Sequence, residues 1–169
     1  MRSIPDVAFG RILVLAGSLA GGVGLSQFPE FSQQYLQRLA GQVDALGEVV
    51  RDFDASAARN GLTREAALAQ LTGTPFLEDR QRDLRRSFLR HARLSDNLMA
   101  LREASPLQRM TMPQRLGDAE TLSATWQDYR PAVPATLDGV TAAGVGFVGG
   151  GGLLAALWGL LRLPFRRFA

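Results

Sequence analysis

The stretch GVTAAGVGFVGGGGLLAALWGLL, residues 139–161, decides the fold, because it runs for twenty-three residues without a charged side chain. A helix of this length is about 34 Å long, which is enough to cross a hydrocarbon core of about 30 Å. Asp138 precedes the stretch and Arg162 follows it. The stretch therefore predicts a transmembrane helix over residues 136–161.

A second apolar stretch, ILVLAGSLAGGVGLSQFP, begins at Ile12 and has eighteen residues without a charge. A secretory signal peptide would have an apolar stretch of about 7–15 residues before a small-x-small cleavage site. The nearest such site is Ser18-Leu19-Ala20, and it leaves too short an apolar segment ahead of it. We therefore favour an uncleaved transmembrane helix over residues 12–28.

The charges are distributed as in a membrane protein. All nineteen basic residues are arginine, and residues 30–138 carry fourteen of them against fifteen acidic residues, so the positive excess lies at the two ends of the chain. A nucleic-acid surface would require a basic face in the central region, so we expect no nucleic-acid partner. Positive residues accumulate on the cytoplasmic side of membrane helices. This predicts cytoplasmic tails at residues 1–11 and 162–169, a periplasmic domain at residues 29–135, and a location in a bacterial inner membrane.

Apolar residues in the central region recur at alternating steps of three and four residues, which is the heptad pattern of an amphipathic or coiled-coil helix. We expect this helix to extend from about Phe31 to Arg59 and to end at Asn60-Gly61. Its seam is either an association surface or the buried face of an antiparallel pair with residues 75–104. The seam residues are Leu36, Leu39, Val43, Leu46, Val50 and Phe53.

Three further helices are predicted in the same region. Thr63 is expected to cap a short helix that ends near Leu71, and Thr74 to cap a long helix that begins with proline at residue 75. Asp118 is expected to cap a last helix, from residue 119 to about 129, with Leu122 and Trp126 facing inward. The fold class is thus all-α, with two transmembrane helices and a helical, coiled-coil-like domain between them.

Both predicted membrane helices are rich in glycine, which lets helix backbones approach closely in lipid. The glycines pack the two helices on each other, pack them against other subunits, or line a pore, and the sequence leaves these alternatives open. The residues that we predict to mediate association in the membrane are Gly17, Gly21, Gly24, Gly144, Gly149 and Gly152.

No catalytic chemistry is indicated by the sequence. It contains no cysteine and one histidine, His91, so thiolate chemistry and a histidine metal cluster are excluded. Nucleophile-elbow, phosphate-loop and dinucleotide-binding motifs are also missing. We expect neither an enzyme nor a cofactor or metal.

The segment from Gly24 to Leu39, with Gln27-x-Pro29-x-Phe31-x-x-Gln34-Tyr35 at its centre, resembles a bacterial inner-membrane family of unknown function. Members of that family have two membrane spans, an intervening helical loop and this junction motif after the first span. The resemblance also includes Tyr129-Arg130-Pro131-Ala132-Val133-Pro134 before the second span. It implies a topology and supplies no activity.

Two function classes remain. The favoured one is a non-enzymatic structural or accessory protein of the inner membrane, which associates through its glycine-rich membrane helices and its heptad helix. It would form a homo-oligomeric scaffold or serve as a small subunit of a larger membrane complex. The alternative is an envelope binding module whose external helices recognise a lipid, cell-wall or protein ligand.

Overall fold

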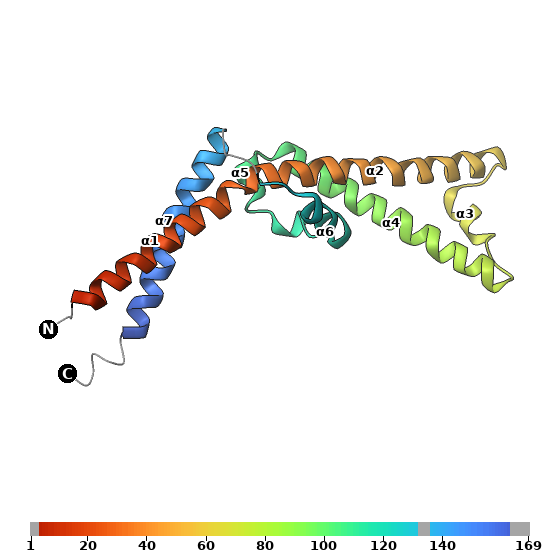
Figure 1. Ribbon diagram of the computed structural model, residues 1–169. Helices are drawn as coiled ribbons and strands as arrows, with labels where there is room; N and C mark the ends of the chain where they lie inside the picture. The colour runs from red at the N-terminus through yellow and green to blue at the C-terminus, as the bar shows by residue number, and fades with distance from the viewer. Residues whose placement is uncertain (1–3, 132–135, 163–169) are drawn as a thin grey trace. The chain divides into compact units, whose positions relative to one another are not determined.

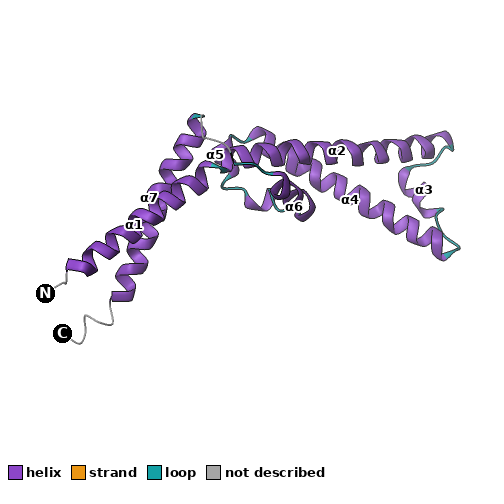
Figure 2. Ribbon diagram, in the orientation of Figure 1, coloured by secondary structure: helices purple, strands orange, loops and turns teal. Residues whose placement is uncertain are grey.

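The computed structural model describes residues 4–131 and 136–162, and throughout these residues the fold is all-α without a β-strand (Figures 1 and 2). The predicted fold class is confirmed. The elements are α1 (Ile4–Ser26), α2 (Phe28–Arg59), α3 (Arg64–Ala69), α4 (Pro75–Glu103), α5 (Pro106–Arg109), η1 (Pro113–Arg115), α6 (Ala119–Asp128) and α7 (Leu137–Arg162). The ends of both predicted cytoplasmic tails and the segment Ala132–Pro134 of the junction resemblance lie outside the described residues.

Two helical runs, one beginning in α1 and the other formed by α7, are long and apolar enough to cross a membrane. α7 extends over the whole predicted span of residues 136–161 except its first residue. α1 begins before the predicted residue 12 and ends at Ser26. The two elements thus match the two apolar stretches of the sequence.

α1 and α2 are separated by a single residue, Gln27, which forms a turn. Proline lacks an N–H and its ring clashes with the carbonyl four residues earlier, so Pro29 cannot continue the hydrogen-bond ladder of α1 back to Leu25. The same residue is tolerated in the first turn of a new helix, where its N–H would have no helical partner. For this reason α2 begins at Phe28, three residues before the start expected from the apolar pattern.

The chain divides into two compact units, which are described separately. The first contains the residues up to Gln33, the segment Pro106–Thr111 and the residues from Tyr129 onward. The second contains Gln34–Ser105 and Met112–Asp128. The first unit therefore holds α1, α5 and α7, and the second holds most of α2 together with α3, α4, η1 and α6.

In the second unit, α2 and α4 are joined through α3, which lies between their diverging ends in Figure 1. The core at this end consists of Val50 from α2, Leu68 from α3 and Phe88 from α4. Phe53 adds an edge-to-face contact with Phe88, with ring centroids 5.3 Å apart. This geometry is favourable for aromatic pairs.

The predicted helix caps are present. The Thr63 hydroxyl accepts a hydrogen bond from the backbone N–H of Ala66 at 3.2 Å, and the Thr74 hydroxyl accepts one from that of Leu77 at 3.2 Å. Each cap satisfies a backbone donor that has no partner within its helix.

The predicted orientation of α6 is wrong. Trp126 is 70% exposed and Leu122 is exposed, whereas Thr121 and Thr125 are buried. The Thr121 hydroxyl lies 2.8 Å from Oε1 of Gln42, and the Thr125 hydroxyl donates to the Thr121 carbonyl at 2.7 Å. α6 thus turns a hydrogen-bonded threonine face inward, and apolar patterning alone does not predict this orientation.

Candidate functional site

The closest helix packing in the first unit is between α1 and α7, and it is made by glycine. A Cβ on Gly21 would overlap the carbonyl oxygen of Gly146, and a Cβ on Gly17 would overlap a side-chain methyl of Leu154. A Cβ on Gly150 would overlap the carbonyl oxygen of Gly17. Backbones this close require glycine on both helices, as in small-xxx-small packing within lipid.

The structure divides the six predicted association glycines into two groups. Gly17 and Gly21 lie against α7. A Cβ on any of the other four would meet no atom of another element within 4 Å. These uncovered positions are Gly24, Gly144, Gly149 and Gly152.

Gly146 and Gly150 were not among the predicted association residues, although they form the α7 side of the packing. The signal in the sequence is their spacing of four residues, which matches the spacing of Gly17 and Gly21 on α1. The run from Gly149 to Gly152 hides this register, because a continuous glycine run gives no preferred helix face.

The heptad seam of α2 is largely used within the chain. Leu39 is fully buried, Val50 is buried, and Phe53 contacts Phe88 of α4. The remaining three seam residues, Leu36, Val43 and Leu46, are half-buried. We therefore interpret the seam as the buried face of a helix pair, one of the two alternatives that the sequence left open.

The junction motif is tied to the segment after α6 within the first unit. The Tyr129 hydroxyl lies 3.0 Å from Oε1 of Gln27 and 3.2 Å from its carbonyl oxygen, both of which are acceptors. The Tyr129 ring also packs edge-to-face on Phe31, with centroids 5.5 Å apart. Burial raises the pKa of Tyr129, and the negative charge of Glu30 raises it further. Gln27 and Phe31, which carry the family resemblance, thus have a structural role at the start of α2.

A polar cluster in the second unit is centred on Asp118, whose side chain is only 6% exposed. Its carboxylate accepts hydrogen bonds from the backbone N–H of Thr121 at 3.1 Å and from the Thr121 hydroxyl at 2.8 Å, which caps α6 as predicted. It also pairs with Arg90 and Arg93, each at 3.3 Å. The carboxylate therefore links α6 to α4.

Burial alone would raise the pKa of Asp118. The hydrogen bonds from Thr121 and the charges of Arg90 and Arg93 outweigh it, and the pKa lies below its usual value. A carboxylate with a lowered pKa stays ionised at neutral pH, so it is a poor general base. The cluster is suited to holding helices together and gives no sign of acid–base chemistry.

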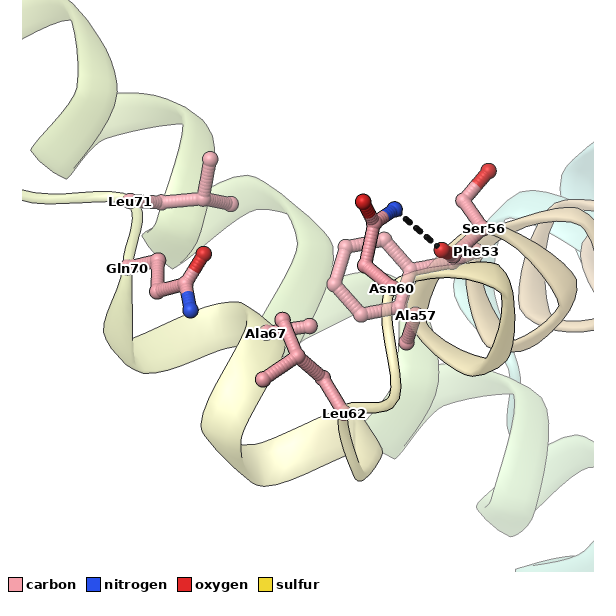
Figure 3. A pocket seen from close by; sticks show the side chains of 8 residues that line it. All are labelled: Phe53, Ser56, Ala57, Asn60, Leu62, Ala67, Gln70 and Leu71. Carbon is pink, nitrogen blue, oxygen red and sulfur yellow. Dashed lines mark hydrogen bonds between the residues drawn. The ribbon is translucent and has the colours of Figure 1, made fainter.

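A hollow of about 540 Å³ lies at the end of the second unit where α2 passes into α3 (Figure 3). It is lined by Phe53, Ser56, Ala57, Asn60, Leu62, Ala67, Gln70 and Leu71. The Asn60 amide nitrogen donates to the Ser56 carbonyl at 2.9 Å. The lining has no titratable side chain, so the hollow can receive a neutral or apolar group and offers no acid or base.

Metal ligands are not assembled in the part of the chain that the structure describes. No three His, Cys, Asp or Glu side chains come together there in a way that would hold an ion. His91 lies on α4 with its Nε2 3.4 Å from the Ser95 hydroxyl.

These features define a helical protein with two helices suited to cross a membrane and a helical unit between them in sequence. The chain belongs to the family described as "Protein of unknown function (DUF2937)", which matches residues 9–167. Neither the curated proteins nor the solved structures contain a match to it.

Proposed function

We propose that this chain is a non-enzymatic accessory or structural protein of a bacterial inner membrane and that it acts by association. It forms a homo-oligomeric scaffold or serves as a small subunit of a larger membrane complex. Both termini are cytoplasmic and residues 29–135 are periplasmic. The topology is supported by the arginines near the predicted spans, of which only Arg38 and Arg130 fall on the loop sides.

One observation carries the association proposal. α7 uses Gly146 and Gly150 to pack on α1, and it carries a second set of glycines that no other element of the described residues covers. Glycine inside a helix costs up to about 1 kcal/mol relative to alanine, so uncovered glycines are unfavourable unless another helix approaches them. In lipid, small residues allow such an approach. We therefore assign Gly144, Gly149 and Gly152 to contact with another membrane helix.

The test is the mass and composition of the particle that contains the full chain after extraction from its native membrane in mild detergent. Association predicts a discrete multiple of 18.3 kDa, or a fixed ratio to other subunits that mass spectrometry identifies. Gly149→Leu with Gly152→Leu is expected to dissociate the particle. Leu160→Phe, on an exposed residue of the same helix that is already large, is the matched control. A single chain of 18.3 kDa without partners would refute the proposal.

The alternative, an envelope binding module, is favoured by the hollow at the end of α2. Its volume of about 540 Å³ lies within the range of small-molecule sites, about 300–1,000 Å³. Native mass spectrometry of the full chain with envelope lipids would detect an adduct. Loss of that adduct in Ala67→Trp, which fills the hollow, would support the alternative, and a chain without adducts would contradict it.

A further inference from the structure

The outward faces of α2 and α4 carry opposite charges. α4 has seven arginines against five acidic residues, whereas α2 has five acidic residues against three arginines. Figure 1 shows the two as neighbouring helices joined through α3. Their facing sides are occupied by the contacts of Val50, Phe53 and Phe88, so both outward faces remain open within the chain.

The outward face of α4 carries one large apolar residue, Leu89, with arginines around it. Leu89 is 73% exposed. Arginines lie seven, four and three residues before it and four residues after it, which places all of them on its side of the helix. We call this set the basic face; its members are Arg82, Arg85, Arg86, Leu89 and Arg93, and all are exposed.

The basic face is only partly neutralised by its own chain. Arg93 pairs with the buried carboxylate of Asp118, whereas Arg82 pairs with Asp79 and Arg86 pairs with Asp83, each across one helical turn. Exposed pairs of this kind contribute little and exchange partners at small cost. Arg85 has no ion pair among the described residues. A large exposed leucine among arginines fits a partner surface that combines carboxylates with an apolar side chain.

α2 supplies such a surface on its outward side. Asp44, Glu48 and Asp52 follow one another at steps of four residues, and Val49, 43% exposed, lies beside them. No ion pair within the described chain involves these three carboxylates, although Arg51 flanks them on the same helix. We call this set the acidic face; its members are Asp44, Glu48, Val49 and Asp52.

The two faces are similar in length. The acidic face is about 12 Å long and the basic face about 16 Å, at about 1.5 Å per residue. Leu89 has arginines one turn away on either side, and Val49 lies at the edge of the acidic face, three residues before Asp52. Contact between Leu89 and Val49 would therefore bring arginines of one face next to carboxylates of the other.

We propose that the basic face of α4 docks onto the acidic face of α2 in a second copy of this chain. The two faces belong to different helices, so the contact is either returned reciprocally between two copies or repeated from copy to copy in a closed ring or an open array. This inference rests on the proposed function and specifies the homo-oligomeric form of it.

Charge reversal in the full chain tests the contact. Arg85→Glu with Arg86→Glu sets like charges against each other, and so does Asp44→Arg with Glu48→Arg. Each double variant is expected to weaken self-association at least about tenfold, because like charges placed opposite each other at an interface repel. A chain with all four changes should recover the parent mass in mild detergent, and an equal mixture of the two double variants should form particles that contain both. Recovery shows that the variants fold.

The matched control is Arg80→Glu with Arg102→Glu. It makes the same change of charge on α4, at exposed arginines that lie off the basic face. The control should keep the parent mass. Loss of association in the control as well would indicate a general charge effect and would overturn the proposal.

Cross-linking gives a second readout, since the chain has no cysteine of its own. A Val49→Cys chain mixed with a Leu89→Cys chain should form a disulfide-linked dimer on oxidation, in higher yield than either alone. Predominant cross-linking of Leu89→Cys to itself would show a symmetric contact and overturn the proposal.

The outcomes separate this inference from the proposed function. A multimer that resists both charge reversals and gives no cross-link between residues 49 and 89 overturns the inference and leaves association intact. A single chain without partners overturns both. Binding of the parent to phosphatidylglycerol vesicles, lost in Arg85→Glu with Arg86→Glu while the mass is unchanged, would assign the basic face to lipid and overturn the inference.

Discussion

Gly21 on α1 and Gly146 on α7 lie so close together that neither residue has room for a side chain. A Cβ on Gly21 would overlap the carbonyl oxygen of Gly146, and a Cβ on Gly146 would overlap the carbonyl oxygen of Gly21. Backbone cannot move aside as the end of a flexible side chain can. The pair therefore fixes how closely α1 and α7 approach.

Gly21→Ala and Gly146→Ala are each expected to destabilise the α1–α7 pair. One methyl group against backbone forces the helices apart, and overpacking of this kind costs about 1–3 kcal/mol. The measurement is the thermal unfolding midpoint of the full chain in detergent, followed by circular dichroism, which should fall in both variants.

Gly24→Ala and Gly159→Ala are the controls on the same two helices. Their Cβ atoms would meet no other element, and alanine favours the helix over glycine by up to about 1 kcal/mol. Their unfolding midpoints should stay unchanged or rise. Equal destabilisation at all four positions would refute the packing role given to Gly21 and Gly146.

Asp118→Asn is expected to lower the free energy of unfolding by about 1–3 kcal/mol at neutral pH. The amide makes weaker hydrogen bonds than the buried carboxylate and cannot form its ion pairs with the two arginines. Asp128→Asn is the matched control. Asp128 also pairs with an arginine, Arg38, but its side chain is 72% exposed. Exposed pairs contribute about 0–1 kcal/mol, so this control should change stability little.

The effect of Asp118 on stability should depend on pH. Its pKa is lower in the folded chain than in the unfolded one, where it is about 3.9. The stabilisation is therefore fully present above about pH 4 and is lost as the pH falls through the folded pKa. Denaturant unfolding at several pH values should show the parent and Asp118→Asn converging in acid. A constant difference down to about pH 2 would contradict the role of this carboxylate.

The long helices and their ends were predictable because they depend on local signals. Thr63 and Thr74 cap their helices, Pro75 begins α4, and the two uncharged stretches form α1 and most of α7. These features follow from backbone hydrogen bonding and hydrophobicity over a few consecutive residues.

The orientation of α6 and the partition of the glycines depend on distant residues. Thr121 faces inward, where its hydroxyl lies within hydrogen-bonding distance of Gln42, which is far away in sequence. Gly146 contacts α1, and Gly144, two residues away, does not. A glycine-rich helix has no side-chain pattern to mark its contact face, so the sequence predicted close packing without identifying all of the residues that make it.

Tyr129→Phe is expected to weaken the attachment of the segment after α6 to the start of α2. The variant keeps the ring contact with Phe31 and removes the hydroxyl that bonds Gln27, at a cost of about 0.5–1.5 kcal/mol. Hydrogen exchange of the backbone amides from residue 129 onward should be faster in the variant. Exchange rates equal to the parent would show that the hydroxyl does not hold this segment.

Substitutions along the heptad seam should follow burial within one chain. Leu39 is fully buried and Leu46 is half-buried. Leu39→Ala is expected to cost about 2–5 kcal/mol of unfolding free energy, as large-to-small changes in a core do, and Leu46→Ala distinctly less. Because the seam is covered by the same chain, Leu46→Ala should leave the mass of the particle unchanged. If Leu46→Ala instead dissociated the particle without lowering the unfolding midpoint, the seam would be an interface between copies, and the buried-face interpretation of α2 would be wrong.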